Sequence, residues 1–127
     1  MSYEVKGHIL GFESMTHVNL TEVDDLFSTM IDANNQDVSF TMVNPYKLRE
    51  YSFDLPSDVK VLLDIHTESN VHVYNIVMIQ KPLENSTVNF LAPIVANMDN
   101  RTIAQVVLNQ KRHPEFGFNE TIISFKG

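Results

Sequence analysis

The sequence contains no cysteine, and only four of its 127 residues are glycine. The lack of cysteine excludes a disulfide framework, a thiolate nucleophile and a zinc–sulfur site. No P-loop, G-x-S-x-G or G-x-G-x-x-G pattern is present either. No apolar run approaches the roughly 20 residues that cross a bilayer, and Met1–Lys6 lacks the basic start and apolar core of a signal peptide. We therefore expect one cytoplasmic domain over residues 1–127, with no membrane contact.

Positive charge is absent from a long early stretch, since no lysine or arginine occurs between Gly7 and Tyr46. The net charge of −7 is therefore distributed unevenly along the chain, and the densest acidic group is Glu22, Asp24 and Asp25. Such a surface repels phosphate backbones and attracts basic proteins, an effect that salt screens. We predict no direct nucleic-acid binding and assign these three residues to electrostatic steering of a partner. A solvated face that aids solubility is the alternative.

Side chains for catalysis or metal binding show no recognisable pattern. The five histidines are scattered, and none is spaced four residues from another on a predicted helix. Asp24 and Asp25 are adjacent, so they point in different directions and cannot form an acid–base pair. Catalysis by residues distant in sequence is left open by this argument. We predict a protein that is not an enzyme and has no cofactor or metal.

Alternating apolar and polar residues predict several strands. Val38–Met42 forms one that ends at Asn44-Pro45, and Tyr51–Leu55 forms another that Pro56 stops. Val71–Ile79 is a third, whose apolar positions change phase near Asn75, so the strand has a bulge or is covered on both faces.

A short helix is predicted after Pro56, with Ser57 as its N-cap. Val59, Leu62 and Leu63 would form its buried side. Many short strands, few glycines and one short helix predict a mostly β fold, a small antiparallel β-barrel or β-sandwich-like domain.

Two segments fit either a helix or a strand. Helical spacing from Val23 to Met30 competes with a strand over Leu26–Ile31 that would pair with Val38–Val43 as a hairpin. We choose the strand. Asn119–Phe125 fits either element, and residues 119–127 are a candidate mobile tail.

The segment Val88–Met98 has an unbroken apolar face at a period of two: Val88, Phe90, Ala92, Ile94, Ala96 and Met98. Asp99-Asn100, which both tolerate positive φ, would join it to Thr102–Leu108 as a hairpin. Pro93 lacks an N–H and predicts a sheet edge or a bulge. An edge with apolar neighbours is a plausible docking surface, so we group Asn89, Leu91 and Pro93 on its second face as candidate partner-binding residues.

Aromatic residues near strand ends and the tail are further docking candidates. Asn44 and Tyr46 follow a strand end, where the ring either caps the core or anchors a partner. Phe116 and Phe118 lie near the tail, where folding back onto the barrel is the alternative. Leu10 and Phe12 flank Gly11, which is suited to a bend, and we expect both side chains to close the core.

Four segments in order carry a resemblance to a known family: Ile9–Glu13, Phe40–Tyr46, Tyr51–Pro56 and Val88–Asn97. With Gln105–Leu108 and Arg112-His113-Pro114, they resemble the flagellar assembly factor family FliW over about residues 9–118. The resemblance implies a small β-barrel-like, non-enzymatic protein that is a monomer when free. It also implies two partners, flagellin and the translational regulator CsrA.

The resemblance implies partner switching: flagellin occupies the protein until it is exported, and the freed protein then binds and antagonises CsrA. Flagellin synthesis would thereby be coupled to flagellin export. The alternative is a dedicated flagellin chaperone without a regulatory role. A second rival is a barrel that binds a small molecule, which predicts a polar-lined cavity with converging titratable groups.

Overall fold

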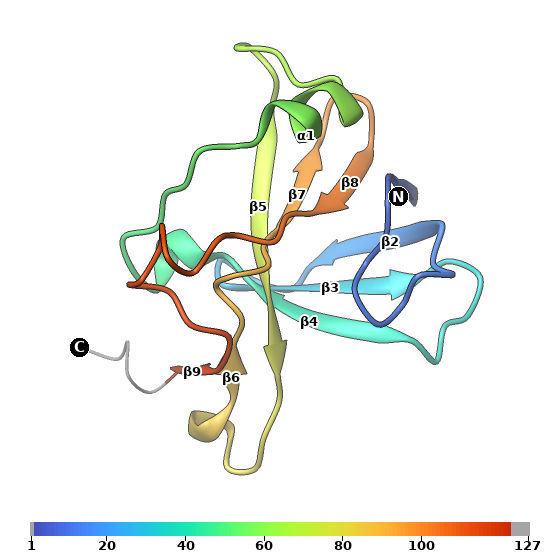
Figure 1. The fold of residues 1–127 in the computed structure, drawn as a ribbon. Helices are drawn as coiled ribbons and strands as arrows, with labels where there is room; N and C mark the ends of the chain where they lie inside the picture. The colour runs from blue at the N-terminus through green and yellow to red at the C-terminus, as the bar shows by residue number, and fades with distance from the viewer. Residues whose placement is uncertain (1, 123–127) are drawn as a thin grey trace.

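The computed structural model describes residues 2–122 and shows a mostly β fold (Figure 1). The strands are β1 (Ser2–Val5), β2 (His17–Glu22), β3 (Phe27–Asp32), β4 (Ser39–Val43), β5 (Val71–Met78), β6 (Thr87–Val88), β7 (Ile94–Asn97), β8 (Thr102–Gln105) and β9 (Glu120–Thr121). The helical elements are α1 (Ser57–Leu62) and the 3₁₀ turns η1 (Pro45–Lys47) and η2 (Leu83–Asn85). Within the described range, α1 is the single α-helix, as predicted.

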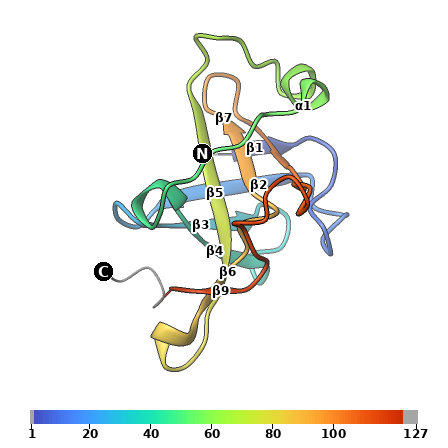
Figure 2. The same cartoon turned by 60° about the vertical axis from the view of Figure 1, so that its left-hand side comes forward.

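Seven strands close into a barrel in the order β4-β3-β2-β1-β8-β7-β5, because β5 also pairs with β4. Every pair in this ring is antiparallel except β1 and β8, which run parallel. The remaining strands, β6 and β9, extend the sheet from β5 at the end opposite α1 (Figures 1 and 2). The predicted β-barrel class is confirmed, with one parallel pair added.

Two apolar clusters cover the two faces of the barrel wall. The interior cluster includes Val18, Met30, Met42, Ile94 and Ile103, all with essentially no exposed surface. The outer cluster is built on the opposite parity of β5, β7 and β8, and its members are Val43, Tyr51, Val59, Leu63, Val77, Val88, Phe90, Leu91, Val95, Ala104, Val106, Leu108, Phe116 and Ile122. The phase change in β5 therefore reflects coverage of both faces.

The β3–β4 hairpin is confirmed, with Phe27 opposite Val43 and Ile31 opposite Ser39. The strand predicted over Tyr51–Leu55 is wrong, because this segment forms no ladder. Its alternation comes from packing on the barrel's outer face, where the Tyr51 hydroxyl donates a hydrogen bond of 2.7 Å to the Phe90 carbonyl.

The start of α1 differs from the predicted one. Pro56 occupies the N-cap position without a side-chain hydrogen bond, so Ser57 is already helical. Val59 and Leu63 are buried as predicted, whereas Leu62 is 44% exposed because the short helix turns it away from the barrel.

The predicted strand Val88–Met98 is interrupted, since residues 89–93 lie outside β6 and β7. Pro93 precedes β7, which is an interior strand of the sheet between β5 and β8. Of the two alternatives predicted at this proline, a sheet edge or a bulge, the sheet edge is therefore wrong. The β7–β8 hairpin is confirmed, but the positive φ falls on Arg101, at 56°.

Two further predictions concern the chain's ends. Gly11 has a φ of 84° in a turn closed by the hydrogen bond from Phe12 N to Ile9 O. The expected burial of Leu10 and Phe12 is wrong, because the turn projects them outward and leaves them 60% and 40% exposed.

In the segment 119–127, Glu120 and Thr121 pair with β6 as a strand, whereas residues 123–127 lie outside the described residues.

Candidate functional site

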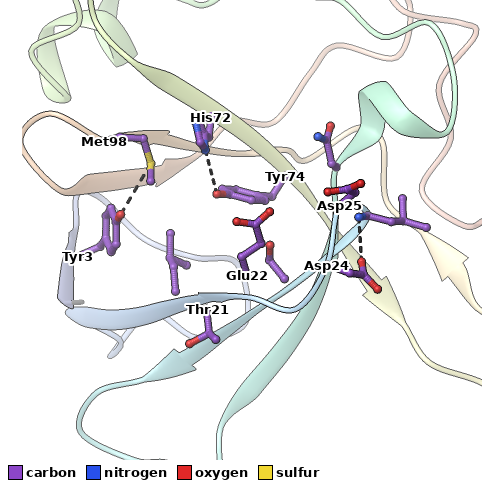
Figure 3. Close-up of a pocket in the computed structure, with 12 residues that line it drawn as sticks. Tyr3, Thr21, Glu22, Asp24, Asp25, His72, Tyr74 and Met98 are labelled. Carbon is purple, nitrogen blue, oxygen red and sulfur yellow. Dashed lines mark hydrogen bonds between the residues drawn. The ribbon is translucent and has the colours of Figure 1, made fainter.

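One mouth of the barrel contains an open depression of about 270 Å³ (Figure 3). The register brings the starts of β1, β3 and β5 to this mouth, together with the ends of β2, β4 and β7. We call it the acidic mouth, and its lining residues are Tyr3, Leu20, Thr21, Glu22, Asp24, Asp25, Leu26, Ser28, Asn44, His72, Tyr74 and Met98. Among residues 2–122, no lysine or arginine lines it. The structure thus brings the three predicted steering residues to one site.

Strand alternation directs Glu22 into this mouth. Val18 and Leu20 belong to or pack against the interior cluster, and Glu22 follows at the same parity as the last residue of β2. The next turn is fixed by Asp24, whose Oδ1 accepts hydrogen bonds from Leu26 N at 2.8 Å and from Phe27 N at 2.7 Å. Asp24 therefore shapes the rim and also charges it.

Tyrosine rings from other strands form the walls. The Tyr3 hydroxyl donates to Met98 Sδ at 3.8 Å, and the Tyr74 hydroxyl lies 3.3 Å from His72 Nδ1 (Figure 3). Burial raises the pKa of Tyr74, and the neighbouring Tyr3 and Glu22 raise it further. The site thus combines carboxylates with aromatic rings, a combination that favours a cation.

A second depression, of about 280 Å³, lies beside the mouth and is mostly apolar. We call it the apolar groove, and its lining residues are Tyr46, Tyr51, Ser52, Phe53, Leu55, Val71, Val73 and Val95. A smaller hollow joins the two, because it shares Asn44, His72 and Tyr74 with the mouth and Tyr46, Val71 and Val73 with the groove. Mouth and groove form one continuous surface.

Two of the predicted partner-binding residues lie where the mouth meets the groove. Asn44 caps η1, since its Oδ1 accepts a hydrogen bond of 3.0 Å from Tyr46 N. Tyr46 is 55% exposed, and its ring meets that of Tyr51 edge-on at 6.1 Å. Partial burial raises the pKa of the Tyr46 hydroxyl. A half-exposed aromatic ring at the centre of such a surface suits an interface anchor.

Asn89, Leu91 and Pro93 do not form an exposed face. Leu91 has no exposed surface and Pro93 is also buried, both beneath the segments that cover the outer wall. Asn89 is half-buried and shapes the local turn, because its Oδ1 accepts from Leu91 N at 3.1 Å. The shared docking face predicted for these three residues is therefore wrong.

The two aromatic residues near the tail separate. Phe116 is buried, with its ring 4.6 Å from that of Tyr51 and the Arg49 guanidinium 4.9 Å from its centroid. It therefore folds back onto the barrel, as the alternative reading held. Phe118 is 50% exposed, and its role in partner binding stays a prediction.

Several residues of this surface were not predicted. Tyr3, His72 and Tyr74 line the mouth from β1 and β5, strands that are distant in sequence from the acidic turn. The available signal was the phase change near Asn75, which indicates that both faces of β5 are packed against other side chains. The apolar residues that alternate from Tyr51 to Leu55 were likewise a signal, because this segment lines the apolar groove.

A model of the FliW protein family matches residues 2–116. This chain belongs to the FliW family. It is 50% identical over 125 residues to a protein of Wolinella succinogenes named flagellar assembly factor FliW 2, covering 98% of this chain and 92% of that protein. It is 46% identical over 127 residues to flagellar assembly factor FliW of Helicobacter pylori strain G27, covering 98% and 94%.

The FliW fold is also seen in a solved structure. The crystal structure of a flagellar assembly factor FliW has a TM-score of 0.88 to this chain at 24% identity, covering 99% of this chain and 88% of that one. Across residues 2–122, no helix is long and apolar enough to cross a membrane. The same residues include no group of three or more histidine and carboxylate side chains placed to hold a metal ion.

Proposed function

We propose that this FliW-family protein serves flagellar assembly as a partner-switching regulator in the cytoplasm. It is a monomer when free and binds flagellin while flagellin accumulates. After flagellin is exported, the freed protein binds CsrA and relieves the repression of flagellin translation. The family match and relatives named flagellar assembly factors support the flagellar role.

The acidic mouth is the observation that carries the regulatory half of the proposal. It gathers Glu22, Asp24 and Asp25 with no lysine or arginine from the described part of the chain, beside an apolar groove that can bury a partner's side chains. An RNA-binding regulator is basic near its RNA sites, so this field steers it toward the mouth. Once bound, the same field opposes the approach of phosphate.

A three-component competition tests the proposal with this protein, flagellin from the same cell, and CsrA on labelled flagellin leader RNA. We expect this protein to release the RNA from CsrA, and excess flagellin to restore the RNA complex. The order of addition should not matter at equilibrium, because one free-energy difference governs the exchange.

Two controls make the result specific. An unrelated acidic protein of similar net charge should leave the RNA on CsrA, which excludes a bulk charge effect. If RNA stays bound while this protein still complexes flagellin and suppresses its aggregation, the protein is a dedicated flagellin chaperone. That outcome contradicts the regulatory half of the proposal.

A further inference from the structure

We propose that the acidic mouth receives a lysine or arginine side chain of the basic partner, CsrA, while a neighbouring apolar side chain of the same partner packs into the apolar groove. Flagellin, under this proposal, does not use the carboxylates of the acidic mouth, although the two bound partners must overlap in space for one to exclude the other. The inference rests on the proposed function and adds to it which of the two partners this surface takes.

The mouth offers carboxylates that have no ionic partner within the described residues. Neither Glu22 nor Asp25 forms a salt bridge there, whereas Glu4 and Glu120 elsewhere do. The depression is lined by Tyr3 and Tyr74, whose rings attract a cation through their faces. A lysine ammonium or an arginine guanidinium supplies both the charge and the N–H donors that this set lacks.

An independent observation at the base of the mouth is the hydroxyl of Ser28. This side chain is only 9% exposed and lines the depression. Ser28 shares its strand parity with Met30, a member of the interior cluster, so it points inward. Its hydroxyl has no hydrogen-bond partner in the part of the chain that the structure describes. Because Ser28 lines the open depression, this oxygen can accept a hydrogen bond from a donor that enters the mouth.

The groove decides between a protein and a small cation as the occupant. A free cationic molecule in the mouth would leave Tyr46, Phe53 and Leu55 uncovered in the groove next to it. A segment of protein that carries a basic and an apolar side chain covers both parts, since the hollow between Asn44 and Tyr74 connects them. Charge complementarity assigns a basic partner to the acidic mouth, and of the two proposed partners the RNA-binding one, CsrA, is basic near its RNA sites.

Two variants and a matched control test the assignment. Glu22→Gln with Asp25→Asn removes two charges from the mouth, and Tyr46→Ala removes the ring at the groove. The control, Asp37→Asn with Asp58→Asn, also changes the net charge from −7 to −5 (two charges removed), but at exposed positions in the β3–β4 turn and in α1. Neither control carboxylate makes a hydrogen bond or salt bridge in residues 2–122.

We measure the affinity of each variant for CsrA and for flagellin by calorimetry, at two salt concentrations, and check folding by thermal melting. The mouth variant should bind CsrA roughly 10- to 100-fold more weakly and lose most of the salt dependence. Tyr46→Ala should weaken CsrA binding roughly tenfold or more. The control should stay within about twofold, and flagellin affinity should be unchanged in all three.

The outcomes separate the inference from the function on which it rests. If the wild-type protein fails to bind CsrA, the proposed function is wrong. If the wild-type protein binds CsrA and the mouth variant binds it equally well, only the site assignment is overturned. An equal loss of flagellin affinity overturns the assignment to the basic partner. Saturable binding of free L-arginine below about 1 mM, a few kcal/mol of affinity, would identify a small-cation site instead.

Discussion

A substitution at Leu91 distinguishes a residue that binds a partner from a residue that packs in the core. The sequence pattern placed it on a docking face, whereas the structure buries it completely in the outer cluster. Replacing a fully buried leucine with alanine removes apolar contacts and leaves a cavity, which costs about 3 kcal/mol. The backbone hydrogen bond from Leu108 N to Leu91 O, at 2.7 Å, is retained, so the cost is one of packing alone.

The size of the chain converts this cost into a melting shift. For 127 residues, the unfolding entropy near 60 °C is about 0.27 kcal/mol/K, from roughly 2.1 cal/mol/K per residue. A loss of about 3 kcal/mol therefore lowers Tm by about 11 °C. Tyr46→Ala, at a residue 55% exposed, should shift Tm by only a few degrees, since partly exposed positions cost little.

Thermal melting followed by circular dichroism, together with urea unfolding, measures both variants on the same scale. The expected pattern is a large Tm loss for Leu91→Ala with partner affinity retained by the folded fraction. A Leu91→Ala protein that melts within about 3 °C of the wild type but binds a partner poorly would refute the core assignment. Such a result would restore Leu91 to the docking surface.

Three further predictions concern the fold and its pH response. Gly11→Ala should lower the free energy of unfolding by about 1 kcal/mol, because φ is 84° there although no atom crowds the added Cβ, and urea unfolding measures it. Glu120→Gln should cost about 1–2 kcal/mol, since the carboxylate accepts from Arg49 at 3.1 Å and from the Gly117 N–H at 2.8 Å; a cost near zero in the same assay would make the C-terminal ion pair dispensable. Burial raises the pKa of Tyr51 from 10.0 to about 12, so as the pH rises the unfolded state loses the hydroxyl proton at a lower pH than the folded state does. The free energy of unfolding should therefore be retained below pH 10 and fall by roughly 2 kcal/mol between pH 10 and 12. The fall should be shallower in Tyr51→Phe.

Local patterns predicted the strands that have one buried face and one exposed face. The β3–β4 hairpin followed from the alternation in Val38–Met42 and its pairing with Leu26–Ile31, because period-two burial leaves a direct trace in the sequence. The β7–β8 hairpin followed in the same way. The positive φ on Arg101 could not be predicted, since Asp99 and Asn100 are the residues that prefer it.

The largest error occurred where a segment is buried on nearly all sides. From Val88 to Met98 every second residue is apolar, yet the chain leaves the sheet at residues 89–93 and enters it again at Ile94. Full burial makes strand and loop look alike in sequence, because both need apolar residues at every position. Asn89 and Pro93 were the local signals of this interruption, since the Asn89 side chain accepts from a backbone N–H two residues on and proline has no N–H to donate to a ladder.

The candidate site depends on closure of the barrel, which no local pattern contains. Glu22 and Asp24 were visible as an acidic group, but their meaning changes once β5 brings Tyr74 against them. An acidic turn facing only solvent aids solubility, whereas the same turn at the rim of a mouth lined by tyrosine rings and by Ser28, whose hydroxyl has no partner in residues 2–122, can select a cation. The charge of the first third of the chain therefore predicts a partner of positive charge. The shape of the candidate site depends on the long-range pairing of β4 with β5, which closes the ring and joins the mouth to the groove.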